Sequence, residues 1–310
     1  MPCFPVKSLH MTKRILLMLV ALFVGVLPAA AAKRHHTTAS ATPSPSDDDS
    51  ASTRLGPDGA PITHAASVVV LDARTGQVLC EKNADEHRPA ASTQKLLTGL
   101  IVAEAGSLDQ PVTVDVSDTW AEPVKLNIQP GETYRRFDLL QVMLVHSMND
   151  VARCLARDNA GSVEAFADRM NRKAAELGMT ESHFVNPNGL PIPDQYSTAR
   201  DMSKVAFAVY HNPLLRSIVC LKQVSFTYAD GRVRQFETTN HVLLKYPLCN
   251  GMKTGYTDAA GHCLISSASN GTREVISVVL GDNGYVWTDS YALLQWGLAG
   301  APSARIGAAN

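Results

Sequence analysis

Two kinds of hydrophobic pattern divide the chain between residues 64 and 300, and their order limits the folds that it can adopt. Short runs rich in valine and isoleucine occur in residues 65–83 and 224–282 and are typical of strands. Between them, residues 91–211 carry apolar side chains at helical spacing. This order indicates an α+β protein with a mixed sheet, in which the first strands return to pair with the late ones and the helices form an insertion.

Turn and capping residues support this division. The pairs at 230–231 (Asp-Gly) and 270–271 (Asn-Gly) are typical of hairpin turns. Ser162 precedes an apolar stripe that predicts a helix over residues 163–177. Residues 91–105 also have helix-forming composition, so we expect the chain to leave the first strands and enter the helical block there.

Composition and cysteine spacing give no indication of nucleic-acid binding or of a metal site. The 310 residues carry a formal net charge of -1, which gives no indication of a nucleic-acid partner. The six cysteines are scattered without the spacing of metal ligands, so we expect no metal site. Most of them lie in apolar runs and are typical of buried thiols, although export would permit disulfides and the sequence leaves their pairing open.

The first part of the chain differs from the rest. A basic start at Lys13 is followed by a short apolar run and then by alanines, which predicts a secretory signal peptide over residues 1–32. Residues 33–62 are polar and predict a disordered linker. We therefore expect an exported protein of the periplasm or wall space, anchored at its N-terminus if the signal is not cleaved. We expect the folded domain to span 63–300 and the short tail over 301–310 not to act as a membrane anchor.

Ser92 and Lys95 form a Ser-x-x-Lys pair near the predicted helix start, where residues three apart lie on one face. A serine hydroxyl becomes a good nucleophile only when a base removes its proton. A lysine can be that base if burial or a nearby cation lowers its pKa. Alone, the pair is more typical of a helix cap beside an exposed lysine.

Two further motifs favour the catalytic interpretation. Ser147 and Asn149 interrupt a helical pattern as Ser-x-Asn, although both residue types also suit a turn. Residues 253–255 read Lys-Thr-Gly on a predicted strand, where glycine lets another backbone approach closely. Each motif occurs once, and their order is that of penicillin-binding proteins and class A β-lactamases.

With these motifs, the stretches "HFVNPNGLP", "STARDMSKVA" and "GMKTGYTDAAGHCLISSAS" resemble the serine D-alanyl-D-alanine carboxypeptidases, the low-molecular-mass penicillin-binding proteins. The resemblance extends from about His64 to Gly300. It implies a β-lactamase/DD-peptidase-like fold, with an antiparallel sheet flanked by helices and a helical subdomain. It also implies peptidoglycan stem peptides as substrates, β-lactam antibiotics as inhibitors and no cofactor.

The resemblance assigns a role to each motif residue. Ser92 would attack the carbonyl between two D-alanines, with Lys95 as its base. Ser147 would relay the proton to the leaving amine, and Asn149 would orient Lys95 and the substrate amide. Water would then release the acyl-enzyme.

The third motif would bind the substrate. Lys253 would add positive potential, and Thr254 would help hold the substrate carboxylate. Gly255 would let the strand approach the nucleophile. The backbone N–H groups of Ser92 and Tyr256 would form the oxyanion hole.

One departure from the family leaves the cleavage specificity open. Well-known carboxypeptidases carry an arginine after the last strand that binds the terminal carboxylate, but the aligned position lies near Thr288. An endopeptidase that cleaves D-alanine cross-links would need this arginine less, so the sequence is also compatible with that activity.

A β-lactamase and a wall-binding protein fit the sequence less well. A class A β-lactamase needs a Glu-x-x-Leu-Asn glutamate, and the nearest candidate, Glu181, has Val185 at the asparagine position. A non-catalytic cell-wall-binding protein would not need the nucleophile and its base.

Overall fold

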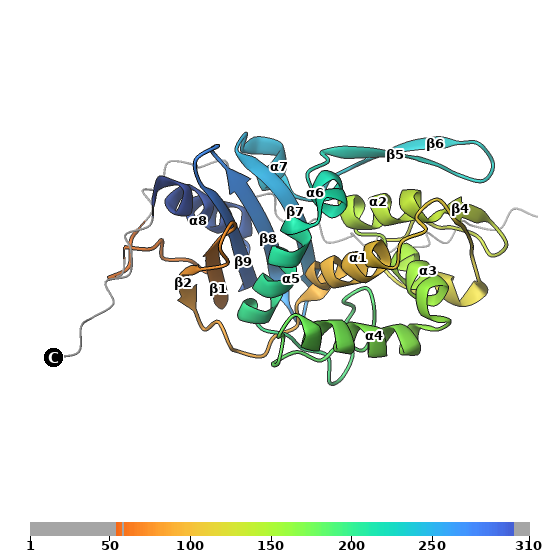
Figure 1. Ribbon diagram of the computed structural model, residues 1–310, viewed down its shortest axis with the longest axis horizontal. Helices are drawn as coiled ribbons and strands as arrows, with labels where there is room; N and C mark the ends of the chain where they lie inside the picture. The colour runs from red at the N-terminus through yellow and green to blue at the C-terminus, as the bar shows by residue number, and fades with distance from the viewer. Residues whose placement is uncertain (1–53, 58, 301–310) are drawn as a thin grey trace, which may run out of the picture. The chain divides into compact units, whose positions relative to one another are not determined.

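The computed structural model describes residues 54–57 and 59–300. Its main sheet has the strand order β2-β1-β9-β8-β7, so the first hairpin joins the sheet through the last strand of the chain (Figure 1). The prediction that the first strands return to pair with the late ones is therefore confirmed. The strands are β1 (Ser67–Asp72), β2 (Val78–Lys82), β7 (Cys249–Thr257), β8 (Gly261–Ser269) and β9 (Glu274–Asp282).

The prediction of a mixed sheet is wrong, because all neighbouring strands of this sheet are antiparallel. The connections give the physical reason. β1 joins β2, β7 joins β8 and β8 joins β9 through short turns, and turns of this length link only antiparallel neighbours. The antiparallel sheet that the family resemblance implied is confirmed.

Both faces of the sheet are covered, which explains the continuous valine and isoleucine runs of β1 and β9. Val69 and Leu71 point into the larger core, on the side covered by α5 (Ala199–His211). Val68 and Val70 point into a smaller core, on the side covered by α8 (Val286–Gly300).

The helical block lies beside the sheet and contributes most of the larger core (Figure 1). The predicted helix after Ser162 is present, and the Ser162 hydroxyl accepts a hydrogen bond from the backbone N–H of Ala165. The helices of this block, besides α5, are α1 (Lys95–Glu104), α2 (Arg136–His146), α3 (Asn149–Ala160), α4 (Val163–Glu176) and α6 (Pro213–Val219).

Small elements complete the described part. Two-stranded sheets are formed by β3 with β4 and by β5 with β6. Their bounds, with those of the short helices, are β3 (Pro111–Thr113), β4 (Thr133–Arg135), β5 (Gln223–Thr227), β6 (Val233–Glu237), η1 (Ala91–Gln94), η2 (Val116–Thr119) and α7 (His241–Lys245).

The predicted signal peptide (1–32) and tail (301–310) lie outside the described residues, as does most of the predicted linker. At the end of that linker, Leu55 and Pro61 form an isolated β-bridge. Within residues 54–57 and 59–300, no helix has the length and apolar character needed to cross a membrane.

Candidate active site

Ser92 lies in the 3-10 helix η1, and Lys95 is the first residue of α1. Residues three apart lie above one another in a 3-10 turn, so the two side chains meet as the spacing predicted. The distance from Lys95 Nζ to Ser92 Oγ is 2.7 Å. This distance is that of a strong hydrogen bond between a nucleophile and its base.

Lys95 is completely buried and has two further partners. Its Nζ lies 2.7 Å from Oδ1 of Asn149 and 2.6 Å from the backbone oxygen of Asn188. Burial, and then the positive charge of Lys253, hold the pKa of Lys95 well below its ordinary value, while the charge of Asp150 opposes this shift. The arrangement therefore favours a neutral amine at Lys95.

Asn149 is oriented by a loop of the helical block. α2 ends at His146 and α3 begins at Asn149, with Ser147 between them at a left-handed φ of 72°. Nδ2 of Asn149 donates to the backbone oxygen of Pro123 at 2.6 Å. Because this bond uses the amide nitrogen, the amide oxygen faces Lys95. Ser147 is also nearly buried, in the turn that leads to Asn149.

Asp150 supports this loop, a role that the three motifs did not indicate. Its buried carboxylate accepts hydrogen bonds from the backbone N–H groups of Leu126, Asn127 and Val151 at 2.8–2.9 Å. The carboxylate thereby holds the segment whose Pro123 oxygen orients Asn149. A charged residue directly after a Ser-x-Asn motif, at a buried helix start, was the signal that could have identified it.

Lys253 and Thr254 lie on β7, which forms one edge of the main sheet. Lys253 is buried, and its Nζ donates to the backbone oxygen of Thr254 at 3.0 Å. Burial lowers the pKa of Lys253 to about 7. The hydroxyl of Thr254 makes a hydrogen bond to the hydroxyl of Thr239, a residue before α7 that the motifs did not include.

Gly255 lies where β7 approaches η1. A Cβ atom at this position would lie 2.8 Å from the backbone nitrogen of Ser92 and 3.0 Å from that of Thr93. Glycine is therefore required by close approach rather than by an unusual backbone angle. The backbone of Tyr256 follows directly, whereas its side chain is exposed and its hydroxyl donates to Asp258 at 3.0 Å.

Asn188 is a second residue that sequence reasoning missed. Its backbone oxygen accepts from Lys95, and Ser92 Oγ lies 3.4 Å from the same oxygen. The next residue, Gly189, packs so closely on η1 that a Cβ atom there would meet the backbone oxygen of Ala91. The sequence indicated this segment only through its likeness to the family, because a backbone acceptor leaves no signal in side-chain identity.

The described residues do not form the arrangement that a class A β-lactamase or a metal site would use. Glu181 is exposed and lies 2.9 Å from the ring of His87, where it forms a surface ion pair when the histidine is protonated. In the described part of the chain, His, Cys, Asp and Glu side chains form no group that could hold a metal ion. Cys154, Cys249 and Cys263 are buried free thiols, whereas Cys220 is an exposed one.

Comparison with known families agrees with this geometry. The family described as D-alanyl-D-alanine carboxypeptidase matches residues 57–284. A D-alanyl-D-alanine carboxypeptidase of Mycobacterium tuberculosis is 33% identical over 81% of this chain and 87% of its own length. The solved structure of a D-alanyl-D-alanine carboxypeptidase from the same organism superimposes with a TM-score of 0.75 at 32% identity, covering 80% of this chain and 97% of that one.

Some relatives are named endopeptidases rather than carboxypeptidases. Others are longer than this chain. A D-alanyl-D-alanine endopeptidase of Escherichia coli is 33% identical over 71% of this chain and 72% of its own length. The carboxypeptidase DacC of Escherichia coli is 35% identical over 77% of this chain, which spans 62% of the length of that relative.

Proposed function

This chain belongs to the D-alanyl-D-alanine carboxypeptidase family and is a serine-type peptidase of that family, and we propose that it uses Ser92 to remove the terminal D-alanine from peptidoglycan stem pentapeptides. The observation that carries the assignment is the 2.7 Å contact between Ser92 Oγ and the buried amine of Lys95. The proposed roles of Asn149, Lys253 and Gly255 are supported by the hydrogen bond of Asn149 to Lys95, the charge of Lys253 near Lys95 and the close approach of Gly255 to Ser92.

The three partners of Lys95 determine where its lone pair points. The amide oxygen of Asn149 and the backbone oxygen of Asn188 can only accept hydrogen bonds. A neutral amine has two N–H bonds and one lone pair, so both N–H bonds go to these acceptors. The lone pair then faces the hydroxyl of Ser92, which donates its proton as Oγ attacks the substrate carbonyl.

The tetrahedral intermediate carries a negative oxygen that needs hydrogen-bond donors. The backbone N–H groups of Ser92 and Tyr256 are the proposed pair, which the absence of a side chain at Gly255 brings close together. Removing one such donor typically costs about 2.7–4 kcal/mol of transition-state stabilisation. Ser147 returns the proton to the leaving D-alanine amine, and water then hydrolyses the ester on Ser92.

The substrate carboxylate is expected beside Lys253 and Thr254. The protonated form of Lys253 attracts it. One of the Thr254 and Thr239 hydroxyls donates to the other, and the second O–H of the pair is left to donate to the carboxylate. The same charge also helps to keep Lys95 neutral. Lys253 therefore contributes both to binding and to the basicity of the catalytic amine.

A cross-link endopeptidase is the second candidate. It is favoured by the absence of an arginine among residues 283–288, after β9, and by relatives that are named endopeptidases. Threonine hydroxyls bind a carboxylate less strongly than a bidentate guanidinium, so a substrate that continues past the scissile bond loses less here.

The proposed substrate also indicates where in the cell the protein acts. Peptidoglycan lies outside the cytoplasmic membrane, so a protein with this activity must be exported. The predicted signal peptide over residues 1–32 would direct that export, although it lies outside the described residues.

Digestion of purified muropeptides with mass detection tests both candidates. Free D-alanine from uncross-linked pentapeptides identifies the carboxypeptidase, whereas conversion of cross-linked dimers to monomers identifies the endopeptidase. Ser92→Ala should abolish either activity and the mass gain that penicillin produces on the wild-type protein. A wild-type protein that neither gains this mass nor releases product would exclude the enzymatic assignment and favour a wall-binding protein.

A further inference from the structure

Residues 236–240, the bridging segment, connect two sides of the candidate site. The segment leaves β6 beside α2 and leads into α7, which packs against β7 (Figure 1). At one end, Phe236 is buried in the larger core. Near the other end, the hydroxyl of Thr239 makes a hydrogen bond to the hydroxyl of Thr254. The bridging segment therefore extends from the side of the site that carries Ser147 to the side that carries Thr254.

His146 joins the bridging segment to the helical block. It is the last residue of α2, directly before Ser147, and its Nδ1 lies 2.6 Å from the backbone oxygen of Glu237. Its ring also packs against the ring of Phe236, with centroids 5.1 Å apart. A backbone oxygen can only accept a hydrogen bond, so Nδ1 carries a hydrogen whether the ring is neutral or protonated. The bond therefore does not depend on the charge of His146.

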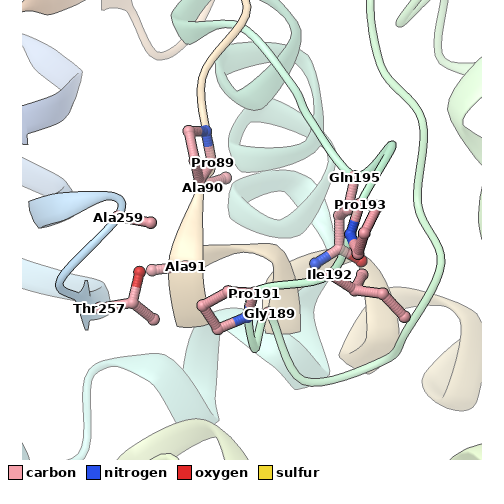
Figure 2. Close-up of a pocket in the computed structure, with 10 residues that line it drawn as sticks. All are labelled: Pro89, Ala90, Ala91, Gly189, Pro191, Ile192, Pro193, Gln195, Thr257 and Ala259. Carbon is pink, nitrogen blue, oxygen red and sulfur yellow. The ribbon is translucent and has the colours of Figure 1, made fainter.

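The bridging segment lies on the leaving-group side of the site. Figure 2 shows the other side, where a cavity of about 270 Å³ lies between the start of η1 and Thr257. None of the described residues that line this cavity belongs to the bridging segment or to the α2–α3 loop. The proposed carboxylate position is beside Thr254, which precedes Gly255 on β7, whereas Thr257 follows it. The contacts of the bridging segment therefore bear on the leaving D-alanine.

The leaving D-alanine has to contact both sides at once. As its bond to the carbonyl carbon breaks, its amine nitrogen receives, through Ser147, the proton that Ser92 gave up. Its carboxylate lies beside Thr254 in the proposed function. The nitrogen and the carboxylate carbon are joined through one Cα atom and lie only about 2.5 Å apart. Ser147 and Thr254 must therefore keep a fixed spacing, although they come from different parts of the fold.

We propose that His146 is a positioning residue, whose hydrogen bond to the bridging segment keeps Ser147 at the correct spacing from Thr254. The inference rests on the proposed function, because the roles of Ser147 and Thr254 are taken from it. Loss of the bond should let the two sides separate, and misplacement of a catalytic group by about 1 Å can cost about 100-fold in rate.

Two substitutions separate the hydrogen bond from the ring contact. His146→Phe keeps a ring beside Phe236 but removes the donor, whereas His146→Asn keeps an N–H group bonded to Cγ but removes the ring. His211→Phe is the matched control, because Nδ1 of His211 also bonds a backbone oxygen, that of Phe207 in its own helix α5, at 2.9 Å. The rings of His211 and Phe207 pack with centroids 4.2 Å apart.

The substrates are Nα,Nε-diacetyl-L-lysyl-D-alanyl-D-alanine and the thioester in which D-thiolactate replaces the last D-alanine. They differ only in the leaving atom and form the same acyl-enzyme. The amine can leave only with a proton, whereas a thiolate leaves without one, because a thiol such as that of cysteine has a pKa of about 8.5. The thioester therefore does not need the proton from Ser147.

For His146→Phe, we expect kcat/KM for the peptide to fall by about tenfold or more and kcat/KM for the thioester to change by less than about threefold. His146→Asn should retain both values within about threefold of the wild type, because the donor is restored. His211→Phe should match the wild-type protein on both substrates. A thermal unfolding curve identifies the folded variants, and His146→Leu repeats the test without a ring if His146→Phe does not fold.

An equal loss of both substrates in His146→Phe would overturn the positioning role alone, because general loosening of the structure does not distinguish the leaving atom. The same role would be overturned by a His146→Asn protein as impaired as His146→Phe, because the ring and not the N–H group would then be required. A wild-type protein that hydrolyses neither substrate and gains no mass with penicillin would overturn the proposed function and this inference with it.

Discussion

The contact between β7 and η1 makes a quantitative prediction for Gly255→Ala. The added Cβ would lie 2.8 Å from the backbone nitrogen of Ser92, and ordinary contact begins at 3.4 Å. The strand and the helix must therefore separate by about 0.6 Å, because the opposing atoms are two backbone nitrogens and the Cβ of Ala91, none of which can rotate aside. The same separation moves the Tyr256 N–H away from the proposed oxyanion position.

Misplacement of a catalytic group by 1 Å can cost about 100-fold in rate, so we expect acylation of Ser92 to slow by about 10- to 100-fold. The assay is the second-order rate of mass gain with benzylpenicillin, beside a thermal unfolding curve. Overpacking should also lower stability by about 1–3 kcal/mol, which corresponds to a few degrees in Tm.

Gly297→Ala is the matched control. Its Cβ would lie 3.0 Å from Cγ1 of Val275, so it also overpacks a backbone position, but between α8 and β9 in the smaller core. It should lower Tm or leave it little changed, and it should acylate at the wild-type rate. If Gly255→Ala acylated as fast as Gly297→Ala, the argument that close approach assembles the oxyanion hole would be refuted.

Three further changes test the electrostatics. Lys253→Gln should move the rising limb of the acylation pH profile to higher pH, since the positive charge that helps to lower the pKa of Lys95 is lost; an unchanged limb would contradict this coupling. Asp150→Ala should lower the free energy of unfolding by at least about 1–3 kcal/mol, measured in urea, because buried backbone N–H groups lose their acceptor, whereas no change would mean that water replaces the carboxylate. Burial and then the charge of Asp289 raise the pKa of Asp282 to about 6, so the folded state binds more protons than the unfolded state between about pH 4 and 6 and loses stability as the pH rises through that window. Asp282→Asn should therefore raise Tm at pH 7.5 and flatten its change between pH 4 and 6, and a lower Tm in both conditions would exclude an unfavourable ionised Asp282.

Local patterns predicted most of the elements because each has a nearby physical cause. Ser162 caps α4 as expected, and the Asn-Gly pair at 270–271 lies in the turn between β8 and β9. The helix expected over residues 91–105 is present, but its first turn is the 3-10 helix η1. The strand pairing direction was not predicted from pattern alone, since an apolar strand covered on both faces reads the same in either direction.

The contacts of the candidate site also divide into local ones, which the sequence predicted, and long-range ones, which it did not. Spacing predicted that Ser92 and Lys95 share a face, because that contact is local. The Thr239 hydroxyl contacts Thr254, and the backbone oxygen of Asn188 accepts a hydrogen bond from Lys95. Both contacts join residues far apart in the sequence, and neither depends on a distinctive residue type, so the sequence did not reveal them. Which residues meet at the candidate site depends on the tertiary fold.

The pairing of β1 with β9 has a consequence for the synthesis of this protein. A nascent chain that has emerged only as far as α6 already contains Ser92 and Lys95, the proposed nucleophile and base. It still lacks β9, which pairs with β1 on the side opposite β2, and β7, which packs against η1. Contacts of such high sequence separation form late, because a long loop must close before they stabilise the chain. Reactivity at the serine should therefore arise only when the carboxyl-terminal third has folded, which keeps an incomplete chain inert towards penicillins.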